Sequence, residues 1–265
     1  MSYVPLSYLD LLLAAALLIA NGAISWAFRL GLEKSIAVAA VRMVIQLALI
    51  GIVLKLIFAQ TSPIWTAGFA MVMVAAATLE IAGRLNGQLP VWPLMGLSGG
   101  ALLFVGTFVT IFGVGFVIAP SPWYGARYIL PILGMVLGNT MTAVALVLDS
   151  LSETARRERG AIEARLALGA PRFEALSGPL RSALRTGMMP MLNAMATTGI
   201  VALPGMMTGQ IIAGADPIGA AKYQVLIMFL IAGATALASL LAAVGGVMLL
   251  TDNRHRLRLM SREGS

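Results

Sequence analysis

Cysteine is absent from this 265-residue chain, and histidine occurs once, at His255. The missing thiols exclude a disulfide, a thiolate metal site and a cysteine nucleophile. Charged residues are also scarce, at 11% of the chain, whereas a soluble domain carries about a quarter. No G-x-x-x-x-G-K-[ST] sequence occurs, so the chain cannot bind ATP through a P-loop.

Apolar residues make up 59% of the chain, and the mean hydropathy is +0.92. Several apolar runs reach the roughly 20 residues that a helix needs to cross a bilayer. We therefore expect an all-α fold, that of a polytopic membrane protein with about seven transmembrane helices. The expected spans are 5–28, 35–59, 64–83, 92–119, 128–149, 187–214 and 221–250.

Lysines and arginines are distributed unevenly between the loops, which predicts the orientation of the chain. With 150–186 in the cytoplasm, that side would hold 14 basic residues: Arg29, Lys34, Arg84, the seven arginines of the loop, Arg254, Arg256, Arg258 and Arg262. The other side would hold three: Lys55, Arg127 and Lys222. This bias predicts an outside N-terminus and a cytoplasmic C-terminus, and it explains the net charge of +7 without a nucleic-acid partner.

The segment 150–186 is hydrophilic, with seven arginines and four glutamates between two apolar runs. Residues 153–168 favour a helix, in which Arg159 and Glu163 stand four apart and can form an ion pair. A charged, helix-prone loop in a membrane protein must act in water, so this segment is the first candidate for an interaction site.

An apolar face on the same helix is formed by Ile162 and Leu166. Gly169 is a plausible C-terminal stop, and Pro171 can open a second short helix. An amphipathic helix of this kind can lie on the membrane surface. It can equally lay its apolar side into a groove on a partner protein.

The core of this loop resembles the cytoplasmic segment by which permease subunits of ATP-binding-cassette (ABC) transporters dock on their ATPase subunits. The shared spacing is E-A-x-x-x-x-G. Arg165 stands where a second alanine is common, and the usual downstream I-x-L-P is missing. The resemblance implies that coupling to an ATPase rests on Glu163, Ala164, Leu166, Gly169 and Ala170.

A longer resemblance covers about residues 30–250. Its segments are TGIVALPGMMTG at 198–209, IAGADP at 212–217, AKYQ at 221–224, GNTMTA at 138–143 and R-x3-QL-x3-G-x2-LK from Arg42. Together they resemble the FetB-type (UPF0014) family of iron- or metal-export ABC permeases. Long ordered runs of Gly, Pro, Met and Asp seldom recur by chance in a membrane helix, so the 198–224 stretch is the most specific part.

The resemblance implies a single transmembrane permease domain over 1–265, with 150–186 as the cytoplasmic coupling-helix loop and 251–265 as a cytoplasmic tail. The protein would lie in the inner (plasma) membrane of a bacterium, surrounded by lipid. Its partners would be a separate cytoplasmic ABC ATPase and a second permease copy in a homodimer, because seven helices commonly supply half of such a pathway. The chain itself would bind no cofactor, since ATP is used by the partner subunit.

The implied function is export of iron or another metal by a transport subunit that is not itself an enzyme. Plant relatives of the family are linked to aluminium tolerance, one through nucleotide-sugar transport. A nucleotide sugar or another organic anion is therefore the alternative substrate. A seven-helix receptor also fits the topology, although retinal-type binding would need a lysine inside the last span, and Lys222 stands at its edge.

Arg42 stands near the middle of the second expected span, where a charge costs about 2.5–3.5 kcal/mol on insertion scales. It should therefore face protein or water, and Gln46 lies one turn away on the same helical face. The two residues either line the translocation pathway or form a buried structural contact, for which Glu80 is a candidate partner.

Two polar stripes are further candidates for the pathway. Asn139 and Thr142 stand on the fifth span, and Asn193 and Thr198 on the sixth. These side chains either line a conduit or form hydrogen bonds between helices that hold the bundle together.

Pro204 and Gly205 should bend or interrupt the sixth span, and Met206 and Met207 follow directly. All four are therefore candidates for the pathway, with alternating access at the break. Thioethers suit Cu(I) far better than Fe(II), and methionine is also a common apolar filler. Carboxylates stand only near predicted membrane edges, so no metal-ligand set is assigned.

Small residues predict where helices approach each other closely. Gly134-xxx-Gly138 in the fifth span and Gly205-xxx-Gly209 in the sixth are two such motifs. Each is expected to bring two backbones together.

Overall fold

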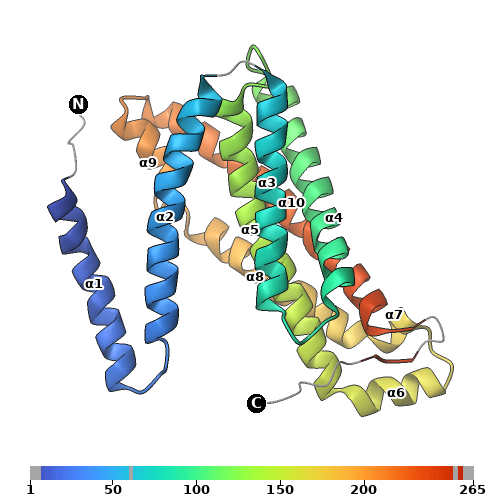
Figure 1. Cartoon of the computed structure of the whole chain (residues 1–265). Helices are drawn as coiled ribbons and strands as arrows, with labels where there is room; N and C mark the ends of the chain where they lie inside the picture. Colours follow the sequence, from blue (N-terminus) through green and yellow to red (C-terminus); the bar gives the residue numbers. More distant parts are fainter. Residues whose placement is uncertain (1–6, 60–61, 253–255, 259–265) are drawn as a thin grey trace. The chain divides into compact units, whose positions relative to one another are not determined.

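A computed structural model describes residues 7–59, 62–252 and 256–258. Every secondary-structure element longer than a single bridge in this part of the chain is a helix (Figure 1). The all-α expectation is thus confirmed. The chain forms two compact units, one of residues 1–61 with 212–214 and one of residues 62–211 with 215–265.

The first unit is a helical hairpin of α1 (Tyr8–Ala27) and α2 (Glu33–Phe58) (Figure 1). Its turn is fastened by the buried Ser25, whose hydroxyl donates to Glu33 Oε1 at 3.0 Å. The same hydroxyl oxygen accepts the backbone N–H of Leu32 at 3.0 Å. The turn is therefore held by side-chain contacts as well as by backbone geometry.

The second unit packs its helices around α5 (Ala126–Arg157), which contacts α3, α4, α8 and α10. Half of the most apolar stretch of α5 is buried. The other elements are α3 (Pro63–Arg84), α4 (Val91–Ile111), the π-helix η1 (Phe112–Ile118), α6 (Arg159–Ala167), α7 (Arg172–Ala175), α8 (Ser177–Thr197), α9 (Gly205–Ile212) and α10 (Pro217–Leu250).

Local sequence signals account for where α3 and α10 begin. Ser62 Oγ accepts the N–H of Ile64 at 3.4 Å, and the Asp216 carboxylate accepts the N–H of Gly219 at 2.8 Å. A proline follows each capping residue, and proline is favoured at the first helical position because its missing N–H is not needed there.

A close contact of α8 with the backbone of α5 occurs at Gly187, whereas at the expected Gly134 a Cβ atom would meet only the end of the Met73 side chain, at 3.2 Å. A Cβ atom at Gly187 would lie 3.0 Å from the carbonyl oxygen of Ala143. At Gly138, Gly205 and Gly209 a Cβ would meet nothing within 4 Å in the described part of the chain. The prediction of close helix contacts is therefore wrong at these three glycines within one copy of the chain.

Six helices are long and apolar enough to cross a membrane, counting only the residues that the structure describes. The expected sixth span, 187–214, is wrong as one helix, because α8 ends at Thr197 and α9 begins at Gly205. Pro204 disfavours helix at the residue before it, and Gly199 holds a left-handed φ of +90°. The break is therefore longer than the Pro204–Gly205 step alone.

The helix that contains the fifth expected span is longer than that span. α5 does not end at residue 149 but continues to Arg157, so the charged loop starts as an extension of a core helix. A rigid helix therefore connects the loop directly to the centre of the second unit.

The described part of the tail folds back on the end of α10. Thr251 and Leu257 form an antiparallel bridge, and the N–H of Arg258 donates to the Leu250 carbonyl at 2.7 Å. Leu257 packs against the apolar core. Three tail residues named above lie outside the described residues: Arg254, His255 and Arg262.

Candidate coupling segment and translocation pathway

The charged loop folds into two short helices, α6 and α7, at one end of the second unit (Figure 1). Arg159 Nε and Glu163 Oε1 lie 2.7 Å apart, which confirms the predicted ion pair. Ile162 is only 1% exposed and belongs to the apolar core, and the half-buried Leu166 packs against that core. The apolar face of α6 is thus occupied by its own chain. It is available neither to a membrane surface nor to a groove on a partner.

The turn after α6 has the hydrogen bonds of a Schellman motif. Gly169 holds φ +92° and its N–H donates to the Leu166 carbonyl, while the N–H of Ala170 donates to the Arg165 carbonyl, both at 3.0 Å. Pro171 then caps α7. The predicted stop and restart of the chain are both confirmed.

Two exposed apolar side chains flank this turn and were not among the candidates from sequence. Leu168 is 88% exposed and Phe173 is 39% exposed. Glu163 and Ala164 are exposed as well. We call these four residues, with Gly169, the α6–α7 tip. The signal that could have found the apolar pair is the placement of two large apolar residues on either side of a Gly-Ala-Pro turn, because turns lie at the surface.

The root of the segment is tied to the turn between α3 and α4. Arg156 Nη2 donates to the Gln88 carbonyl at 3.4 Å, and Gln88 Nε2 donates to Asp149 Oδ1 at 2.8 Å. Arg165 Nη1 reaches the Ala175 carbonyl at 3.4 Å, which links α6 to the end of α7. A push on the tip would therefore reach α5 and the α3–α4 turn together.

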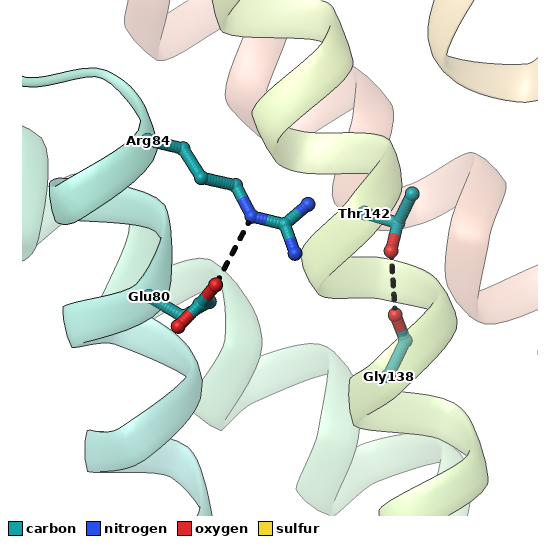
Figure 2. Close-up of polar contacts among 4 residues, drawn as sticks. All are labelled: Glu80, Arg84, Gly138 and Thr142. Atoms are coloured by element: carbon teal, nitrogen blue, oxygen red, sulfur yellow. Dashed lines mark hydrogen bonds and ion pairs between the residues drawn. The ribbon is translucent and has the colours of Figure 1, made fainter. Parts of the chain in front are cut away.

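Three of the candidate polar side chains on α5 and α8 bond within their own helices, although Ser150 Oγ of α5 donates to Thr186 Oγ1 of α8 at 3.5 Å. Thr142 Oγ1 donates to the Gly138 carbonyl at 3.0 Å (Figure 2), and Asn139 Nδ2 donates to the carbonyl one turn back at 2.8 Å. Thr198 Oγ1 likewise donates to the Ala194 carbonyl at 2.7 Å. These contacts do not join helices, so the interhelical interpretation loses support, and the acceptor lone pairs stay available. Asn193 stands on the same helix and is exposed.

Arg42 and Gln46 lie in the first unit, where they line one shallow groove along α2. The prediction that they share a helical face is confirmed. Glu80, the suggested partner of Arg42, pairs with Arg84 one turn away on α3, with Arg84 Nε 3.4 Å from Glu80 Oε1 (Figure 2). Whether Arg42 lines the pathway or contacts Glu80 stays a prediction.

The break between α8 and α9 exposes its residues. Ile200 is 91% exposed and Val201 81%. On the α9 side, the Pro204 carbonyl accepts the N–H of Thr208 at 3.0 Å, which starts the helix at Gly205. Met206 packs against the apolar core.

Metal-binding side chains do not gather anywhere in the described residues. No group of three or more His, Cys, Asp or Glu side chains lies close enough to hold an ion in that part of the chain.

Residues 8–249 match the model of a protein family described as "Uncharacterised protein family (UPF0014)". This chain belongs to that family. The resemblance inferred from the 198–224 stretch is thereby confirmed, and with several spans the chain is an integral membrane protein.

Curated relatives in the family are similar over most of their length. The "Probable iron export permease protein FetB" of Escherichia coli (strain K12) is 30% identical over 94% of this chain and 93% of its own. The "UPF0014 membrane protein YjkA" of Bacillus subtilis (strain 168) is 34% identical over 90% and 93%. The "UPF0014 membrane protein STAR2" of rice, Oryza sativa subsp. japonica, is 35% identical over 83% and 75%. No solved structure matches the chain significantly.

Proposed function

We propose that this chain is the membrane-spanning permease subunit of an ABC transporter that exports iron or another metal. The observation that carries the proposal is the α6–α7 tip, an exposed segment built on a core helix. A permease without a P-loop needs an ATPase from another chain, and the tip offers the contact surface. The name of the Escherichia coli relative supports iron as the substrate.

In this proposal the ATPase pushes on the tip, and the movement passes into the membrane through α5 and α8. The buried Ile162 and the Arg156–Gln88 contact make the segment stiff enough to transmit it. Access would alternate at the break that precedes Gly205. A second copy of the chain would complete the pathway, so the active form is a homodimer with two ATPase subunits.

Co-purification with an ABC ATPase encoded next to the chain tests the coupling role. Glu163→Lys and Gly169→Asp should each abolish the complex. Gly31→Asp is the matched control, because Gly31 also holds a left-handed φ of +70° with open space around it but lies in the turn between α1 and α2, outside the tip. A chain that binds no ATPase, or binds it equally well in all variants, would refute the proposal.

An organic anion such as a nucleotide sugar is the alternative substrate. Arg42 in the middle of a span favours it, because a cationic side chain at that depth suits an anionic ligand. Uptake into inside-out vesicles, driven by ATP and measured for Fe²⁺, Mn²⁺ and a nucleotide sugar, separates the two substrates. Metal uptake alone supports the main proposal, and sugar uptake alone supports the alternative.

A further inference from the structure

The break between α8 and α9 contains backbone oxygens that have no hydrogen-bond partner among the described residues. The Thr197 carbonyl accepts the N–H groups of Val201 and Ala202, and the Ala202 carbonyl accepts the N–H of Gly199 at 2.9 Å. Five other carbonyls of the break accept no hydrogen bond from any group in the described residues: those of Thr198, Gly199, Ile200, Val201 and Leu203.

The depth of the break makes these free oxygens informative. Arg185 is the last charged residue before the break, and at about 1.5 Å per residue Thr197 lies about 18 Å further along α8. α8 is not among the described helices that are long and apolar enough to cross a membrane, but the predicted orientation puts Arg185 on the cytoplasmic side and requires the chain to cross the membrane again before α10. In a hydrocarbon core about 30 Å thick, that orientation places the break near the middle. Unpaired backbone groups are tolerated there only where they line a water-filled path or are covered by protein.

The chemistry of the break suits a cation. Carbonyl oxygens are ligands for hard cations, and the Thr198 hydroxyl keeps acceptor lone pairs while it donates to Ala194. The C-terminal end of α8 adds the negative end of its helix dipole. Carboxylate clusters are lacking in the described residues, so neutral oxygens are what the chain offers at this depth.

We propose that the backbone carbonyls of Thr198, Gly199, Ile200 and Val201, with the Thr198 hydroxyl, bind the transported species as a hard metal cation that keeps part of its water shell. This inference rests on the proposed transport function and names its substrate chemistry. Neutral ligands hold a cation loosely enough for it to leave again, which conduction requires. Met206 then acts in packing, in agreement with its contact with the core.

The decisive experiment makes one backbone carbonyl a weaker ligand without changing any side chain. Replacing the amide before Ile200 by an ester weakens the Gly199 carbonyl, and the N–H lost from Ile200 donates to nothing in the described part of the chain. Binding of Mn²⁺ to the purified full-length chain, followed by electron paramagnetic resonance, should weaken about tenfold, which corresponds to a loss of about 1.4 kcal/mol. Unchanged Mn²⁺ affinity, or no Mn²⁺ binding by the unmodified chain, would overturn the inference.

A glycine pair provides the second arm, again with Mn²⁺ as the probe. A Cβ at Gly199 or at Gly233 of α10 meets nothing within 4 Å, but only Gly199 of the two has a left-handed φ, +90°. Gly199→Ala should therefore distort the carbonyls and weaken Mn²⁺ binding, while Gly233→Ala should leave it unchanged. Equal effects of the two changes would contradict the inference.

Because Mn²⁺ binding is measured without an ATPase, its result is independent of the coupling experiment. ATP-driven uptake of a nucleotide sugar without any Mn²⁺ binding would refute the cation site but would still support the proposed ABC permease function. Carbonyl-dependent Mn²⁺ binding in a chain that binds no ATPase would refute the proposed ABC permease function but would support the cation site. Cu⁺ binding that depends on Met206 and Met207, with Mn²⁺ binding unaffected by the ester, would assign the site to the thioethers instead.

Discussion

Gly169 carries the sharp turn of the α6–α7 tip with φ +92°. A side chain at such a position costs about 1–2 kcal/mol, so Gly169→Ala should distort the tip while the membrane helices stay folded. Gly160→Ala is the control, because Gly160 lies in α6 with open space around it and no left-handed φ. We expect Gly169→Ala to lower substrate-stimulated ATP hydrolysis in the purified complex and Gly160→Ala to leave it unchanged; equal activity would argue against a role for the turn.

Leu168 and Ile162 give a residue-level test of which side of α6 meets the partner. Leu168 is 88% exposed and Ile162 is 1% exposed. Leu168→Ala should weaken ATPase binding without changing the thermal stability of the chain in detergent. Ile162→Ala should instead lower stability by about 2–4 kcal/mol, because it leaves a cavity in the core. Titration calorimetry and thermal unfolding distinguish the outcomes, and the reverse pattern would mean that the inner face does the docking.

At the scale of elements, the contact of α8 with α5 depends on one missing side chain. A Cβ at Gly187 would lie 3.0 Å from the backbone oxygen of Ala143, which cannot rotate away. Gly187→Ala should therefore destabilise the second unit by about 1–3 kcal/mol, as measured by unfolding in mixed micelles. Gly138→Ala on the open side of α5 should change stability little. If the two variants unfold alike, the tight crossing of α5 and α8 is not present in the membrane.

At the scale of the whole molecule, the natural absence of cysteine makes the orientation directly testable. Trp123 precedes α5 and Leu168 follows it, and both are exposed. The charge bias predicts that a cysteine at position 168 reacts with a membrane-impermeant maleimide only from the cytoplasmic side, and one at 123 only from outside. Labelling of both from one side would contradict the predicted topology.

Much of the coupling segment was predictable from local sequence. The Arg159–Glu163 pair, the stop at Gly169 and the restart at Pro171 each depend on residues within about one helical turn. The length of the break was less predictable. Pro204 and Gly205 indicated an interruption, but the loss of helix from residue 198 onward depends on backbone hydrogen bonds inside the break.

The amino-acid sequence was enough to predict that the chain spans a membrane and where most of its helices lie, because apolar run length and turn residues act locally. Only the tertiary structure decided the direction of the apolar face of α6, which turns inward because Ile162 meets a core assembled from helices distant in the chain. It also placed the tight helix contact at Gly187 and left five carbonyls of the break without a hydrogen-bond partner in the described part of the chain. These features depend on which segments pack together, and a periodic pattern in one helix carries no information about its neighbours.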